Sequence, residues 1–133
     1  MMEEKFYTIV EEIYEKDSRY KEEAYAFVME ALGYTQKKFK NPKHVSGDQL
    51  LDGIKELLMN KFGPMTMTVL EYWGIQKTED FGNIVFNLVK NKVLTKTEDD
   101  DIEHFKDAYD FDEVFNRGYR KLLNKKISRM RQV

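Results

Sequence analysis

Residues that could bind a metal ion gather between Glu98 and Glu113, in the run EDDDIEHFKDAYDFDE. Carboxylates and imidazoles are common metal ligands, but this run lacks the glycine and the alternating oxygen ligands of a calcium loop. His104 has no second histidine in an HExxH arrangement. We therefore expect no dedicated metal site and no cofactor.

Nucleophilic and phosphate chemistry also lack their usual residues. The chain has no cysteine, and its 2 histidines, His44 and His104, are far apart in the sequence, so no Ser–His–Asp arrangement is indicated. The tripeptide DFG at 80–82 stands without the other kinase motifs, and no glycine-rich phosphate-binding loop is present. The prediction is a non-enzymatic protein with no catalytic residue. The alternative is an enzyme whose carboxylates are brought together only by the fold.

Charge is divided unevenly along the chain. With 22 Lys and Arg against 24 Asp and Glu, the net charge is −2. Residues 116–133 carry seven basic groups and no acid, so this tail has a charge of +7 and the other 115 residues carry −9. Such asymmetry is typical of an interaction arm. The candidate residues for binding nucleic acid or a partner are Arg117, Tyr119, Arg120, Lys121, Lys125, Lys126, Arg129 and Arg131.

Three kinds of partner suit this basic segment. Lysine and arginine bind nucleic-acid phosphates with release of counterions, and Tyr119 and Arg120 can stack on unpaired bases. A basic amphipathic helix also binds a protein groove or an anionic membrane surface. The interpretation favoured by the sequence needs no partner, because the segment can pack over its own acidic stretch Glu98–Glu113 or form a solvated face.

Composition indicates a folded, water-soluble domain. Hydrophobic residues make up 41% and charged residues 35% of the chain, and the mean hydropathy is −0.67. No stretch has the ~18 uncharged apolar residues that a membrane span needs. The N-terminal MMEEKFYTIVEE is acidic and amphipathic, unlike a signal peptide. Together with the absence of cysteine this favours a cytoplasmic protein, and abundant Lys and Glu would also suit a thermophile.

Hydrophobic periodicity predicts a single, mostly α domain (α+β) over residues 1–133, with about six helices and one small β-hairpin. Residues 1–40 are expected to form a helical hairpin. Its helices are predicted at 3–16 and at about 18–32, the second capped by Ser18, before an irregular segment that begins at Gly33.

Residues 44–115 are expected to hold three helices and the hairpin. Ser46 and Gln49 have the spacing of a capping box at the start of a helix over 46–62. Further helices are predicted at 64–73, ended by Gly74, and at 78–91. The branched residues of VLTKTE at 93–98 predict a short strand, and 102–109 is expected to return as a second strand, with helix as the alternative.

A long basic helix is predicted over residues 110–131. Asp110 and Glu113 have the spacing of a second capping box. Apolar residues then stay near one face of the helix, namely Phe111, Val114, Phe115, Tyr119, Leu122 and Met130.

Three helices followed by a hairpin loosely resemble a winged helix in the second half of the chain, where helix 78–91 would enter the major groove. Glu79 and Asp80 at the start of that helix would repel phosphates. Phe81, Ile84 and Leu88 belong to a wide apolar face. We therefore expect this helix to lie in the core, with Gly82 at a close approach of another segment.

Several motifs resemble a family of small uncharacterised bacterial proteins, of the kind called conserved hypothetical proteins, with no known activity. The motifs are YAFVMEAL at 25–32, HVSG at 44–47, FGPM at 62–65, WGI at 73–75, TEDFGNIVFNLV at 78–89 and DFDEVF at 110–115. The likeness covers most of the chain but not the basic tail after Phe115. It implies one bacterial domain and brings no catalytic residue, cofactor or partner.

The sequence thus favours a non-enzymatic, cytoplasmic interaction module with an unknown protein partner. The alternative is a nucleic-acid-binding protein that holds RNA or DNA electrostatically through its basic C-terminal helix. A homodimer is a further alternative, because periodicity alone does not assign every aromatic residue to one core. The residues in question are Tyr25, Tyr34, Phe39, Tyr72 and Phe86.

Overall fold

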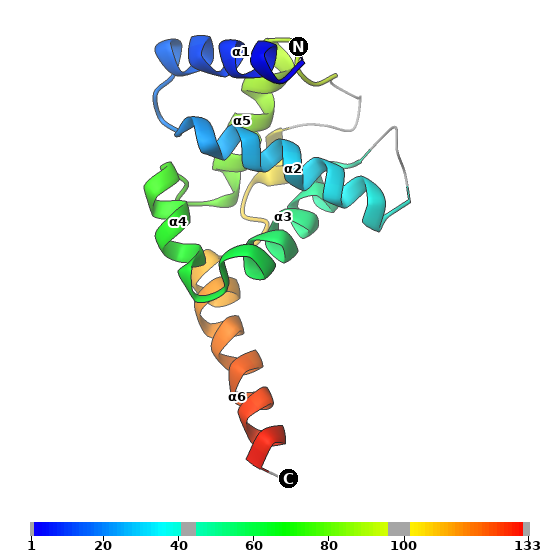
Figure 1. Ribbon diagram of the computed structural model, residues 1–133, viewed down its shortest axis with the longest axis vertical. Helices are drawn as coiled ribbons and strands as arrows, with labels where there is room; N and C mark the ends of the chain where they lie inside the picture. Colours follow the sequence, from blue (N-terminus) through cyan, green and yellow to red (C-terminus); the bar gives the residue numbers. More distant parts are fainter. Residues whose placement is uncertain (1, 41–44, 96–101, 132–133) are drawn as a thin grey trace.

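A computed structural model of the protein describes residues 2–40, 45–95 and 102–131, and every regular element in these ranges is helical. Figure 1 shows α1 at one end of the longest axis and α6 extending away at the other. In chain order the elements are α1 (Met2–Lys16), α2 (Glu22–Lys38), α3 (Gly47–Phe62), the 3-10 helix η1 (Gly63–Met65), α4 (Thr66–Trp73), α5 (Thr78–Lys90), the 3-10 helix η2 (Ile102–Phe105), the π-helix η3 (Asp112–Arg117) and α6 (Gly118–Arg131).

Helix α5 lies in the core, as its wide apolar face predicts. Phe81, Ile84 and Leu88 are fully buried. They belong to one cluster with buried side chains of α2 and α3, among them Val28 and Ile54. The expectation that this helix packs inside the domain is therefore confirmed.

An aromatic cluster ties α4 to the preceding helices. Trp73, at the end of α4, lies 5.2 Å from Phe27 of α2 and 5.8 Å from Phe62 of α3, measured between ring centroids. Such pairs contribute about 0.5–1.5 kcal/mol each beyond the area that they bury. Gly74 follows in the left-handed conformation, with φ of 84°, and ends α4 as predicted.

The predicted capping box at Ser46 is formed in full, and the one predicted at Asp110 is formed by one of its two hydrogen bonds. The backbone N–H of Gln49 donates to Ser46 Oγ, and the N–H of Ser46 donates to Gln49 Oε1, both over 3.1 Å. The N–H of Glu113 donates to Asp110 Oδ1 over 2.9 Å. Both depend on residues three apart, which is why the sequence alone revealed them.

Helix α2 begins later than predicted, and Ser18 does not cap it. The cap position is Lys21, whose backbone N–H donates to the carbonyl of Trp73 over 3.1 Å. Between α1 and α2 the Asp17 carboxylate instead accepts the backbone N–H of Arg19 over 3.2 Å. A contact with α4, distant in the sequence, thus fixes this helix start.

Helix α2 also continues past residue 32, where the prediction ended it. Thr35 is fully buried. The Tyr34 hydroxyl donates to Glu56 over 2.5 Å, and the Lys38 ammonium donates to Asp52 over 2.8 Å. These contacts with α3 stabilise the last turns of α2, since tertiary packing overrides weak local propensity.

The predicted β-hairpin is wrong wherever the structure describes it. The backbone N–H groups of Val93 and Leu94 both donate to the carbonyl of Leu88, over 2.9 and 3.3 Å, so the chain turns at the end of α5. Residues 96–101, which complete the first predicted strand and the turn, lie outside the described ranges. Residues 102–105 form η2 rather than a strand. The described second half is therefore not winged-helix-like.

Segment η2 packs closely on two glycines. A Cβ added at Gly82 of α5 would lie 2.9 Å from Phe105 Cβ, and one added at Gly47 of α3 would lie 3.3 Å from the Phe105 ring. Phe105 itself is buried. The close approach predicted at Gly82 is confirmed, because the Phe105 side chain fills the space that a larger residue at position 82 would take.

The predicted continuous helix at 110–131 contains a π-helical turn. Segment η3 carries the chain from the body into α6, with Phe111 buried just before it and Phe115 buried within it. Their rings lie 5.6 Å apart, and Phe111 lies 6.0 Å from Phe81 of α5. These contacts anchor the last helix to the core at its beginning only.

Candidate interaction surface on helix α6

Helix α6 leaves the body of the protein and projects away from it (Figure 1). Every residue from 120 to 130 is exposed. Near the start of the helix the Tyr119 ring still packs on the body, 3.6 Å from the position of a Cβ added at Gly63. The expectation that this helix packs over the acidic stretch 98–113 is therefore wrong for 102–113, and 98–101 lie outside the described residues.

The projecting helix carries an apolar stripe that no described residue covers. Leu122, Leu123, Ile127 and Met130 are 51%, 43%, 38% and 75% exposed. With the half-buried Tyr119 they recur at intervals of three and four residues, which places them along one side of the helix. We call these five residues the apolar stripe.

Part of this stripe was not predicted. Leu122 and Met130 were expected on the apolar face of the helix, whereas Leu123 and Ile127 were not. The signal was present, because 119, 123, 127 and 130 follow helical spacing. The predicted apolar face begins at Phe111, which is buried, whereas the residues from Leu122 onward are exposed.

A shallow pocket of about 200 Å³ lies where the stripe begins. Met59 and Asn60, near the end of α3, form one wall. Tyr119, Leu122, Leu123 and Lys126 of α6 form the other. The apolar surface of the helix thus continues onto the body at this point.

Most of the predicted basic residues are exposed on α6 and lack acidic partners among the residues that the structure describes. Arg120, Lys121, Lys125, Lys126 and Arg129 are exposed, and none forms an ion pair with a residue that the structure describes. Arg117 differs, since its Nε lies 3.2 Å from Asp112 Oδ2 within η3. Arg131 ends α6, and its side chain lies outside the described part. The cluster that the sequence predicted is thus largely brought together on one free helix.

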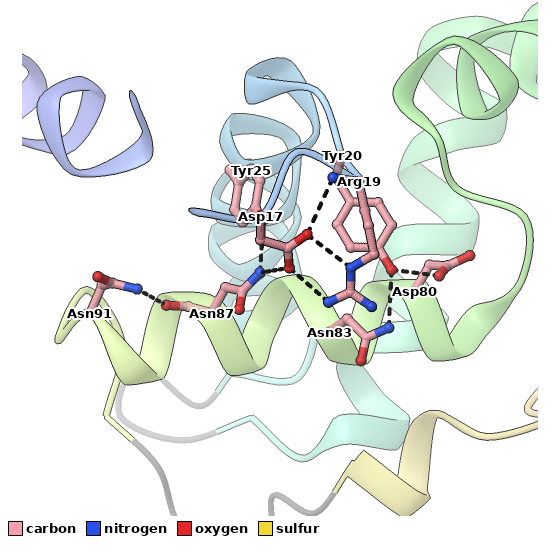
Figure 2. Close-up of polar contacts among 8 residues, drawn as sticks. All are labelled: Asp17, Arg19, Tyr20, Tyr25, Asp80, Asn83, Asn87 and Asn91. Atoms are coloured by element: carbon pink, nitrogen blue, oxygen red, sulfur yellow. Dashed lines mark hydrogen bonds and ion pairs between the residues drawn. The ribbon is translucent and has the colours of Figure 1, made fainter. Parts of the chain in front are cut away.

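The polar residues of α5 are used inside the protein. Figure 2 shows Asn83 and Asn87 directed at the segment that joins α1 to α2. The Asn83 amide donates to the Tyr20 hydroxyl over 3.0 Å, and the Asn87 amide donates to Asp17 over 3.1 Å and to the Tyr25 hydroxyl over 3.0 Å.

Asp80 completes this network at the start of α5. Its carboxylate accepts the Tyr20 hydroxyl over 2.5 Å and the backbone N–H groups of Gln76 and Lys77 over 2.8 and 3.1 Å. The negative charge also stabilises the positive end of the helix dipole. A helix whose leading carboxylate and amides are engaged in this way does not offer them to DNA.

Electrostatics in this network stabilise the fold. Hydrogen bonds from the Arg19 guanidinium, helped by Asn87, hold the pKa of Asp17 well below the ordinary carboxyl value. Burial and the hydrogen bond to Asp80 raise the pKa of Tyr20, and burial raises the pKa of Tyr25. No buried side-chain nitrogen or oxygen in the described residues lacks a hydrogen-bond partner.

The structure also places His104 and the aromatic residues that periodicity left unassigned. The exposed His104 belongs to η2, and the described residues contain no group of three or more His, Cys, Asp or Glu side chains arranged to hold a metal ion. Of the unassigned aromatic residues, Tyr25 is buried and Tyr34 is half-buried. Phe39, Tyr72 and Phe86 are 38%, 63% and 49% exposed.

Comparison of the chain with models of protein families, with curated proteins and with solved structures gives no match. Among the described residues, no helix combines the length and apolar character needed to cross a membrane.

Proposed function

We propose that the protein is a non-enzymatic interaction module that presents α6 to a protein partner. The observation that carries this proposal is the apolar stripe on a projecting helix. Helix α6 has 14 residues, and isolated helices shorter than ~12–15 residues are marginal in water. An amphipathic helix of this kind gains most of its stability from the surface on which it packs.

The chemistry of α6 indicates what the partner must offer. Leu122, Leu123 and Ile127 fit an apolar groove, in the mode by which amphipathic helices dock. The flanking lysines and arginines favour a groove bordered by carboxylates, which would steer the encounter and set its orientation. The absence of cysteine supports a cytoplasmic setting. The resemblance to uncharacterised bacterial proteins fits the proposal but adds no chemistry.

The proposal is tested by a photo-crosslinking residue at Ile127. The control is the same residue at Glu71, which is exposed on α4. We expect a specific protein adduct from position 127 in cells and none from position 71. The variant Leu122→Glu, combined with the crosslinker at 127, should lose the adduct while its melting temperature stays unchanged. Equal labelling from both positions, or no adduct at either, would contradict a docking role for α6.

Nucleic-acid binding is the second candidate, and the unpaired cations on α6 favour it. Five contacts to phosphate would give a plot of log affinity against log salt with a slope of about −4 to −5. Replacing Lys121, Lys125 and Arg129 by glutamine should then weaken RNA or DNA binding uniformly across sequences. Leu122→Glu separates the two candidates more sharply. It should abolish docking on a protein, which depends mainly on the apolar stripe, and should affect nucleic-acid binding less. The absence of binding at low salt would exclude this function.

A further inference from the structure

The outer face of α1 is chemically complementary to α6. Glu11 and Glu15, one helical turn apart, are exposed, and neither forms an ion pair with a described residue. Tyr7, 54% exposed, and the half-buried Tyr14 lie along one edge of this acidic face. An acidic row beside aromatic rings is thus presented to solvent at the end of the molecule opposite to α6 (Figure 1).

An apolar groove adjoins the same edge of α1. It has a volume of about 590 Å³, and Tyr7 forms part of its lining together with Phe6, Ile9, Ala26 and Met29. The lining also contains Lys5 and Lys92. A basic helix that used this groove would therefore place its apolar side chains there and its cations beyond Tyr7, over Glu11 and Glu15.

Helix α6 has the matching arrangement. Lys121, Lys125 and Arg129 recur every four residues and form a basic row beside the apolar stripe. Figure 1 shows α1 lying across the longest axis and α6 extending along it, so in a two-fold pair α6 of one copy crosses α1 of the other. The basic row and the acidic row then meet where the two helices cross.

Resting on the function proposed above, we infer that the partner of α6 is a second copy of this chain. Helix α6 of each copy packs across α1 of the other in a two-fold dimer. A chain cannot make this contact with itself, because α1 and α6 lie at opposite ends of its longest axis (Figure 1). Pairing of α6 with α6 is opposed by the like charges on both helices.

Two-fold symmetry doubles the area that the contact between α6 and α1 buries. A stable interface buries about 800 Å² on each partner, more than one short helix usually supplies. In the two-fold arrangement every chain contributes both its α6 and its α1, so the contact forms twice. The acidic body, with a charge of −9 outside residues 116–133, and the tail, with +7, then neutralise each other between copies.

The test measures the dissociation constant of the full chain by sedimentation across a range of protein and salt concentrations. We expect a dimer that weakens at high salt. Leu122→Glu with Ile127→Glu, and separately Glu11→Lys with Glu15→Lys, should each weaken it at least about tenfold, since they remove apolar anchors or create repulsion. All four positions are exposed in the single chain, so an unchanged melting transition in a dilute sample would show that the fold is intact. Glu71→Lys on α4 is the matched charge control and should leave the dimer unchanged.

Charge exchange makes the test specific for α1. Adding Lys121→Glu and Lys125→Glu to the Glu11→Lys and Glu15→Lys variant should restore the dimer. A chain that stays monomeric throughout, or a dimer that tolerates reversal at Glu11 and Glu15, would overturn the inference. If the chain is monomeric but Ile127 still crosslinks to another protein, the inference fails and the proposed function stands. If the monomer binds RNA through its basic row and gives no protein adduct, both fail.

Discussion

Thr35 of α2 lies so close to the backbone of α3 that a Cβ added at Gly53 would be 1.8 Å from its Oγ1. The threonine is fully buried, and its hydroxyl donates to the carbonyl of Ala31 over 2.7 Å. Its hydroxyl is thereby satisfied within α2, so the contact with Gly53 is one of packing alone. The crossing of α2 and α3 depends on the absence of a side chain at Gly53.

Gly53→Ala should destabilise the protein by about 2–3 kcal/mol, because overpacking a tight crossing forces the backbone to move. The free energy of unfolding in urea measures this. Gly33→Ala is the matched control, since no atom lies within 4 Å of a Cβ at Gly33, and it should stabilise α2 by up to about 1 kcal/mol. Adding Thr35→Ala to Gly53→Ala should recover part of the loss. Equal effects at both glycines would contradict the tight crossing.

Acid should remove the contribution of Asp17 to stability. The folded protein lowers the pKa of Asp17 from its ordinary value of 3.8, chiefly through hydrogen bonds from Arg19, so its contribution is complete above pH 3.8 and declines as the pH falls toward the folded value. We expect Asp17→Asn to be less stable than the natural chain at pH 6. The difference should shrink as the pH falls below 3.8. A constant difference over this range would show that the charge of Asp17 is not involved.

High pH should remove the contribution of Tyr20 to folding stability, as low pH removes that of Asp17. Burial and the hydrogen bond to Asp80 raise the pKa of Tyr20 above its ordinary value of 10.0, so the folded state favours the neutral ring. The contribution is present below pH 10.0 and is lost as the pH rises through the folded value. Tyr20→Phe should therefore lose less stability than the natural chain between pH 8 and pH 11. Ultraviolet titration should show a late-ionising tyrosine that is missing in this variant.

The anchoring of α6 can be separated from its projecting part. Phe115→Ala should cost about 3–5 kcal/mol, because it removes a buried ring that contacts Phe111 and Tyr109. Met130→Ala, at a residue that is 75% exposed, should change the free energy of unfolding by no more than about 0.5 kcal/mol in dilute solution. Similar costs at both positions would mean that α6 contributes to the core along its whole length.

Local signals predicted much of the helical fold. Ser46 and Gln49 are three residues apart, so their mutual hydrogen bonds could be recognised without a structure. Gly82 within an apolar helix indicated a close approach, and Phe105 makes it. Glu79 and Asp80 argued against DNA recognition by α5, and Asp80 accepts hydrogen bonds at the start of that helix.

The errors arose where contacts distant in sequence decide the local structure. Helix α2 extends to Lys38 because Thr35 and Tyr34 contact α3, and neither contact follows from the spacing within GYTQKK. Val93 and Leu94, at the start of the supposed strand, turn back on Leu88 instead. The candidate site posed the same difficulty, since helical periodicity is identical for a docked helix and a projecting one. The cations of α6 were predictable as residues, but their exposure was not.

The π-helical turn η3 also sets the phase of α6 relative to the body. An α-helix advances by about 100° per residue, so one residue gained or lost within Asp112–Arg117 would rotate everything after it by that angle. Most π-helices are single-turn bulges inside α-helices. The direction in which Leu122, Ile127 and Met130 face is therefore set by the six residues of η3. A shift in that register would redirect the whole helix surface while leaving its composition untouched.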